Sequence, residues 1–299
     1  MTSLFKKNQP DQTDFPKQQP SYNFKKFLGH GILHLIIILY LIYLIFPLIW
    51  MVSTSLKPTS EIYSGIPSLV PRHATLIHYF TVLTEERLLR TIANSLFVGV
   101  ITAFAVVAIT LPAAYALVRY KTKINNVVLG WILTSQIFPA ILLIIPLYMI
   151  LRPLNLVDSL GGLILVYVVW DIPFVLWMLQ GYVKEIPLEL EEAATIDGAT
   201  RGQILYRIIF PLLLPAIGAA TLFAFITAWN EFFFALVLMK TPDLMTLPVE
   251  LARFTGIEGQ ARTGPLAAAS FIATIPSIVF FMMIRKWFSS GALYGAVKG

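Results

Sequence analysis

Residues 31–52, GILHLIIILYLIYLIFPLIWMV, decide the fold, because these twenty-two residues contain no Asp, Glu, Lys or Arg. An α-helix needs about 20 apolar residues to cross the roughly 30 Å hydrocarbon layer of a bilayer. The uncharged interval extends beyond this stretch, from Phe27 to Leu56. The sequence therefore predicts a transmembrane helix here and a membrane protein as a whole.

Five further runs are long enough to span. They lie near residues 93–117, 125–151, 159–182, 208–238 and 264–284, and only Asp171 and Glu231 interrupt them with an acid. The runs are continuously apolar and lack the alternation that membrane strands require. They predict an all-α polytopic membrane protein with six transmembrane helices.

Composition supports this class. Hydrophobic residues make up 57% of the chain and charged residues 13%, against about 25% charged in ordinary globular proteins. The absence of cysteine excludes disulfides, iron–sulfur clusters and thiolate metal sites. The net charge of +6 comes from short flanks between apolar runs, which fits membrane orientation better than a nucleic-acid partner.

The flanking charges predict the orientation. With residues 1–30 in the cytoplasm, six spans return the C-terminus to the same side, which then holds fourteen of the 22 Lys and Arg. This bias agrees with the positive-inside rule. We expect 1–30 to be a disordered cytoplasmic tail and 31–299 to be one membrane domain, whose first run is retained and is not a cleaved signal peptide.

Residues 186–199, IPLELEEAATIDGA, lie between the fourth and fifth runs, on the predicted cytoplasmic side. Pro187 suits a first helical position, and the glutamates that follow suit a helix N-terminus. Asp197-Gly198 is a turn signal, so two short helices meeting at an angle are expected, with Ala193 and Ala194 as a small-residue face. The alternative is an amphipathic helix on the membrane surface.

This loop resembles the EAA loop of binding-protein-dependent ABC importer permeases. The matching residues, in this sequence's numbering, are Glu192, Ala193, Ala194, Asp197, Gly198, Ala199, Ile208, Ile209, Phe210 and Pro211. Phe210 stands where Leu is usual, which keeps the position apolar. Other segments are similar to the carbohydrate, MalG-type subfamily: 46–47, 55–58, 94–96, 113–117 with Arg119, 229–231 and 295–299.

The resemblance implies a MetI-like permease fold that works with partners. These are a second homologous permease subunit, two ATP-binding-cassette ATPase subunits and an extracytoplasmic sugar-binding protein, in a bacterial-type inner membrane. It implies that the loop at about 183–207 couples to the ATPase, that the loop near 239–263 meets the binding protein, and that Val297, Lys298 and Gly299 reach the ATPase interface. The chain has no phosphate-binding loop, so ATP and Mg are expected on the partners, with no cofactor and no catalysis here.

Polar residues inside the spans are candidates for a translocation path. An acid at the bilayer centre costs about 2.5 to 3.5 kcal/mol, so it should face a partner or a watery cavity. Asp171 follows Trp170, and Glu231 follows Trp229-Asn230. Such groups suit a neutral polyol. Alternatively, Glu231 and Asn230 hold the spans together, and Asp171 caps a break at Pro173.

Other functions stay open on the sequence. An ABC importer for another solute and an ion-coupled secondary carrier both fit intramembrane acids. A membrane-embedded enzyme would need a nucleophile and base, or a metal set, and neither is visible. His30 and His34 share a helical face but lack a third ligand, so no metal site is predicted.

Overall fold

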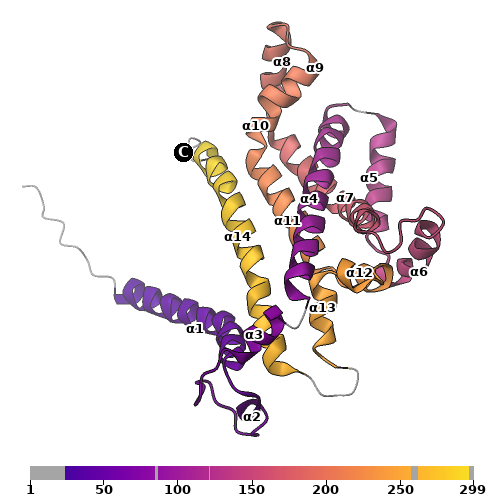
Figure 1. Cartoon of the computed structure of the whole chain (residues 1–299). Coiled ribbons are helices and arrows are strands. Elements are labelled where there is room, and N and C mark those ends of the chain that lie inside the picture. Colours follow the sequence, from indigo (N-terminus) through magenta and orange to yellow (C-terminus); the bar gives the residue numbers. More distant parts are fainter. Residues whose placement is uncertain (1–23, 85–86, 121, 257–261, 296–299) are drawn as a thin grey trace, which may run out of the picture. The chain divides into compact units, whose positions relative to one another are not determined.

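The computed structural model describes residues 24–84, 87–120, 122–256 and 262–295, and within them all regular structure is helical (Figure 1). The all-α expectation is confirmed for these ranges. The chain divides into two compact units, residues 1–49 and 50–299. In the first, α1 (Phe24–Ser55, running on into the second unit) provides a segment, Gly31–Ser55, that is long and apolar enough to cross a membrane.

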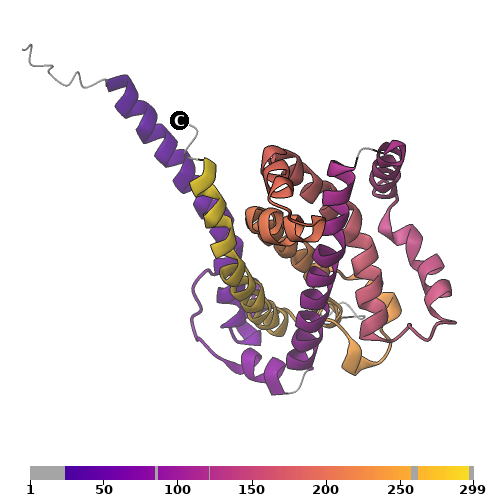
Figure 2. The same ribbon diagram turned by 90° about the horizontal axis from the view of Figure 1, so that it is seen from above.

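Three helices form the centre of the second unit: α4 (Leu88–Arg119), α7 (Leu160–Glu185) and α11 (Leu214–Asn230). α4 packs along both α7 and α11 (Figure 2). Small residues allow the close approach: a side chain at Gly99 of α4 would begin 3.1 Å from the Phe225 ring of α11. Ala103 and Ala114 of α4 are likewise fully buried.

The remaining long helix, α14 (Thr263–Gly295), packs against α11 and against α3 (Ile77–Thr84), and it also contacts the short α2 (Thr59–Ile62). Together with α1, α4 and α7 it makes four helices of spanning length among the described residues. They correspond to the runs predicted at 31–52, 93–117, 159–182 and 264–284.

Two predicted runs are not single helices. The run at 125–151 consists of α5 (Lys123–Ser135) and α6 (Ala140–Leu151), separated at Pro139, whose missing N–H and extended backbone begin a new helix. The run at 208–238 is also interrupted. Its first part joins α9 (Arg201–Ile204) through a π-helical turn, η1 (Leu205–Ile209), and α10 (Phe210–Leu212). The axis then bends by 77° into α11.

The run at 208–238 has a second break at Glu231, and its last part is α12 (Phe233–Leu238). Counting the bent pair as one crossing gives five candidate spans among the described residues.

The two ends of α4 meet different loops. Near its start, the Asn94 amide donates to the carbonyls of Asp243 and Met245, each at 2.9 Å, and the Leu247 N–H donates to Ser95 Oγ at 2.8 Å. This end therefore holds η2 (Pro242–Leu244) and α13 (Leu247–Arg253). Its last turn meets α8 (Glu189–Ile196), which with α9 lies at the opposite end of the unit (Figure 1).

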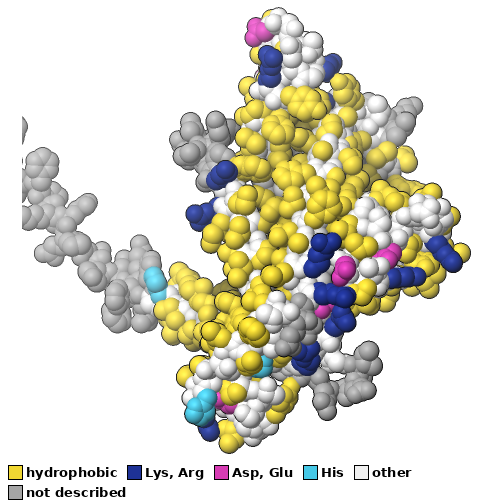
Figure 3. All heavy atoms as spheres, viewed as in Figure 1, with side chains coloured by type: hydrophobic (Ala, Val, Ile, Leu, Met, Phe, Trp, Pro, Cys, Tyr) yellow, Lys and Arg dark blue, Asp and Glu magenta, His cyan; other side chains and the backbone are white. Residues whose placement is uncertain are grey.

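The surface between these ends is largely apolar. In Figure 3, hydrophobic side chains cover most of the visible face between α8 and α13, and Lys and Arg are visible near the top, at the left edge and in the lower right part of that face. A lipid-facing surface has this distribution.

Candidate functional site

The helix pair α8–α9 is built by its turn. Gly198 has φ of +82°, which is the left-handed conformation expected at Asp197-Gly198. The Ala199 N–H donates to Ala194 O and the Gly198 N–H to Thr195 O, both at 3.0 Å. These two bonds form a Schellman motif that ends α8 and releases the chain into α9. The predicted pair of short helices is confirmed, although α8 begins at Glu189 and leaves Pro187 before its N-cap, Leu188.

α9 begins with a capping box. The Gln203 side chain accepts from the Thr200 N–H at 2.8 Å, and the Thr200 hydroxyl accepts from the Gln203 N–H. Local hydrogen bonds thus end α8 and begin α9, and the outward side chains are available for other contacts. The exposed residues of the motif are Glu192, Ala193, Asp197 and Gly198, and Ala199 is half-buried.

One expectation for this loop is wrong. Ala194 does not share an exposed small-residue face with Ala193, because it is 8% exposed and belongs to the hydrophobic core. The exposed side instead carries the apolar Ile196, at 86% exposure, beside Ala193 and Glu192. An acidic residue, a small residue and an apolar residue therefore face outward together.

A buried carboxylate fastens α8 to α4. Glu191 Oε1 accepts from Arg119 Nε at 2.5 Å, and Oε2 accepts from the Tyr115 hydroxyl at 2.7 Å. Arg119 Nη2 also donates to the Ile186 carbonyl, the C-cap of α7, at 2.9 Å. Sequence reasoning missed this contact, although Tyr115 and Arg119 share a helical face at a spacing of four.

Of the candidate path residues, Asp171 lies at the contact of α7 with α11. It is 4% exposed, and Oδ2 accepts from the Thr227 hydroxyl of α11 at 2.8 Å. The carboxylate therefore has a partner across the helix pair, as a buried acid requires. Thr227 was not identified from the sequence, since a lone threonine in an apolar run carries no distinct signal.

Glu231 lies at the break between α11 and α12. Its carboxylate accepts from the Phe234 N–H at 2.8 Å and the Ala235 N–H at 3.1 Å, and from the Tyr167 hydroxyl of α7 at 2.6 Å. The acid caps the first turn of α12 and links it to α7. This geometry agrees with the alternative in which Glu231 holds the spans together.

The other candidate path residues, Trp170, Trp229 and Asn230, differ in burial and in contacts. Trp170 packs edge-on against Phe234, with ring centroids 5.6 Å apart, and is half-buried. Trp229 is 6% exposed. Asn230 is exposed, and its side chain donates to Ile226 O at 2.8 Å. Val297, Lys298 and Gly299 lie outside the described residues.

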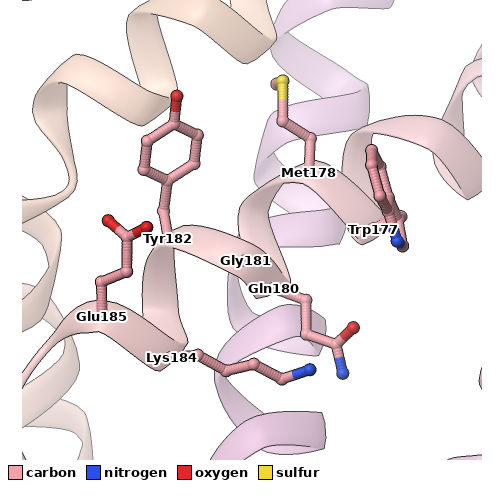
Figure 4. A pocket seen from close by; sticks show the side chains of 7 residues that line it. All are labelled: Trp177, Met178, Gln180, Gly181, Tyr182, Lys184 and Glu185. Atoms are coloured by element: carbon pink, nitrogen blue, oxygen red, sulfur yellow. The ribbon is translucent and has the colours of Figure 1, made fainter.

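A pocket of about 300 Å³ lies beside the C-terminal half of α7 (Figure 4). The lining residues come from the part of α7 that follows Asp171 and leads to α8. Its lining combines aromatic rings, a buried amide and two charged side chains: Trp177, Met178, Gln180, Gly181, Tyr182, Lys184 and Glu185. Aromatic rings with amides and charged groups can hold a polyhydroxylated ligand.

At the other end of α7, Asp158 joins the α6–α7 loop to the segment after α12. Its carboxylate accepts from the N–H groups of Lys240 and Thr241 at 2.8 and 2.9 Å, and from the Thr241 hydroxyl at 2.6 Å. The Thr241 side chain is the largest cause that lowers the pKa of Asp158. Asp158 is therefore held as a carboxylate, which accepts all three bonds.

The apolar helical fold agrees with the class that comparison with known proteins shows, a permease subunit of a transporter. Residues 105–294 match the family described as "Binding-protein-dependent transport system inner membrane component", and the chain belongs to that family. Its relatives are named as permease proteins of ABC transporters and of sugar transport systems, and this chain is an integral, multi-pass inner-membrane subunit and not an enzyme.

The chain is similar to several curated permeases. It is 51% identical over 229 residues, 77% of this chain and all of the relative, to "Putative ABC transporter permease protein ORF1" of Streptomyces antibioticus. It is 37% identical to "Trehalose transport system permease protein SugB" of Mycobacterium tuberculosis, over 86% of this chain and 93% of the relative. It is 36% identical to "Diacetylchitobiose uptake system permease protein DasC" of Streptomyces coelicolor, over 86% and 92%.

A solved structure shares the fold. It is described as "Crystal structure of a bacterial ABC transporter involved in the import of the acidic polysaccharide alginate". The TM-score is 0.76 at 24% identity, and the match covers 90% of this chain and all of that chain. The likeness extends well beyond residues 105–294.

Proposed function

We propose that this chain is the membrane permease of a sugar importer and moves a sugar or related neutral polyol inward by alternating access. Relatives named for trehalose, for diacetylchitobiose and for trehalose and maltose support the substrate class. The partners are a second permease subunit, two ATPase subunits that hold ATP and Mg, and an extracytoplasmic sugar-binding protein. A second solved relative is described in complex with an alginate-bound periplasmic protein, which supports the last of these.

The observation that carries the proposal is the exposed α8–α9 pair. Its first helix presents Glu192, Ala193 and Ile196 outward, while Glu191 and Ala194 hold it to the bundle. A short helix fixed on one side and exposed on the other suits docking into a cleft on an ATPase. We assign coupling to Glu192, Ala193, Ala194, Asp197, Gly198 and Ala199, with Ala194 acting from within the core.

We further propose six crossings with both termini in the cytoplasm, residues 1–30 forming a tail and 31–299 one permease domain. The α8–α9 pair and the η2–α13 segment meet opposite ends of α4. The spanning length of α4 supports the proposal that the loops at 183–207 and 239–263 face opposite sides of the bilayer. The C-terminal residues Val297, Lys298 and Gly299 contact the ATPase in this scheme.

The substrate path is proposed along α7 and α11. Asp171 and Glu231 sit at the contact of these helices, Trp170 lies beside them, and Trp229 and Asn230 end α11. The pocket at Trp177–Glu185 continues along α7 toward the coupling loop. Hydroxyl groups of a sugar would exchange hydrogen bonds with the carboxylates and amides, and its C–H faces would stack on indole rings.

The test of coupling replaces Gly198 with Val and, as a matched control, Gly202 with Val. A side chain at either site would meet nothing within 4 Å, but only Gly198 has positive φ. A β-branched residue there costs about 1–2 kcal/mol and distorts the turn. We expect Gly198→Val to abolish ATPase docking and uptake, and Gly202→Val to retain both. Normal uptake and normal assembly of the Gly198 variant would refute the coupling role.

A further inference from the structure

The first turn of α8 carries three acids, and they do not share one environment. Glu189 and Glu192 are exposed, whereas Glu191 is 5% exposed. The side chain of its partner Arg119 is only 10% exposed. A buried charge is retained only with good hydrogen-bond geometry, so Glu191 has a different task from its neighbours.

The Glu191 carboxylate joins three elements. Arg119 and Tyr115 come from the last turns of α4, Glu191 from α8, and the second Arg119 bond reaches Ile186 at the end of α7. Both carboxylate oxygens have a donor, and the arginine fork contacts two elements at once. We call Tyr115, Arg119 and Glu191 the clamp.

Apolar packing holds α8 only weakly. Besides Glu191, Ala194 is its one buried residue, and its larger apolar side chains are exposed. The chain on either side is bounded by Pro187 and by the Gly198 turn, where backbone direction changes. Without the clamp, α8 could pivot about these two points and leave α4 where it is.

We propose, on the basis of the function above, that the clamp is the rigid link by which movement of α8 is passed to α4. The three residues are positioning residues, which act through the helices that they join. α4 packs along α7 and α11, which hold Asp171 and Thr227, so a displacement of its last turn is carried to the polar contact in the bundle. Docking through Glu192 and transmission through Glu191 are then separate steps on one helix.

The test uses the complete complex in liposomes, with binding protein and trehalose as the probe sugar. Two near-isosteric variants weaken the clamp, Glu191→Gln and Tyr115→Phe. Tyr120→Phe, at the same end of α4, is the control, because it keeps the ring over which Arg201 lies. For each, the bound ATPase, the ATP hydrolysis rate and the sugar imported per ATP are measured. We expect both clamp variants to keep the ATPase subunits and hydrolyse ATP, with sugar per ATP about tenfold lower. The control should match wild type.

An unchanged ratio of sugar to ATP in assembled clamp variants would overturn the proposal. Loss of bound ATPase from a variant that still assembles with its partner permease would also overturn it, because Glu191 would then act in docking. If Glu191→Gln does not accumulate, Tyr115→Phe decides: a lower ratio supports the link, and an unchanged ratio rejects it. Failure of the underlying function has a different signature, in which the wild-type chain itself retains no ATPase.

Discussion

Gly162, in the first turn of α7, has no room for a methyl group. A Cβ added there would lie 1.9 Å from the Leu156 carbonyl oxygen, where real contacts are not shorter than 3.0 Å. The loop would have to withdraw by about 1 Å. Asp158, two residues beyond Leu156, resists this because its N–H donates to Leu238 O at 2.9 Å and its carboxylate holds the following segment.

Overpacking of this kind costs about 1–3 kcal/mol, and Gly→Ala in a helix returns about 1 kcal/mol. Gly161 supplies the control, since its added Cβ would meet only Ser159 Oγ at 3.6 Å. We therefore expect Gly161→Ala to be neutral or slightly stabilising. The free energy of unfolding of Gly162→Ala should be about 2 kcal/mol lower than that of Gly161→Ala. Thermal unfolding of the purified complex in detergent measures the difference, and equal melting temperatures would refute the packing argument.

Three further changes test other contacts. Asp158→Asn should lower stability at neutral pH. The folded-state pKa of Asp158 is depressed, so the carboxylate stabilises the fold above the unfolded pKa of about 4, and this stabilisation disappears as pH falls through the lower folded value. A stability difference between wild type and variant that is independent of pH would contradict this. Glu231→Ala should cost about 1 kcal/mol or more, because the first turn of α12 loses its acceptor; no change in denaturant midpoint would argue against capping. Gly264→Ala would place a Cβ 2.2 Å from His78 Nε2, so melting should occur at lower temperature, and unchanged melting would show that the imidazole moves freely.

Local chemistry made part of this molecule predictable. The apolar runs predicted the four long helices because length and lack of charge are properties of the chain itself. The Asp197-Gly198 turn was predictable for the same reason, since positive φ is a local preference of glycine.

The breaks were harder to place. Proline suggests interruption, yet in the structure many prolines remain inside helices: Pro47, Pro112, Pro146, Pro173 and Pro276. Pro139, in contrast, separates two helices. Proline inside a membrane helix is tolerated when neighbouring groups satisfy the freed carbonyl, so its effect depends on tertiary surroundings that composition does not contain.

Long-range pairs were not predictable at all. Tyr115 and Glu191 are 76 positions apart, and Tyr167 and Glu231 are 64 apart. Helical periodicity places each side chain on a face but does not say which faces meet. The three acids of the α8 first turn are alike in the sequence, and only packing separates Glu191 from the exposed Glu189 and Glu192.

The central claim is that the exposed side of α8 meets an ATPase on the cytoplasmic side. The chain contains no cysteine, so Ala193→Cys creates a single reactive thiol on an exposed residue of this helix. A membrane-impermeant maleimide should label it in inside-out vesicles, and bound ATPase subunits should block the reaction. Labelling from the extracytoplasmic side, or an equal rate with and without the ATPase, would contradict the account.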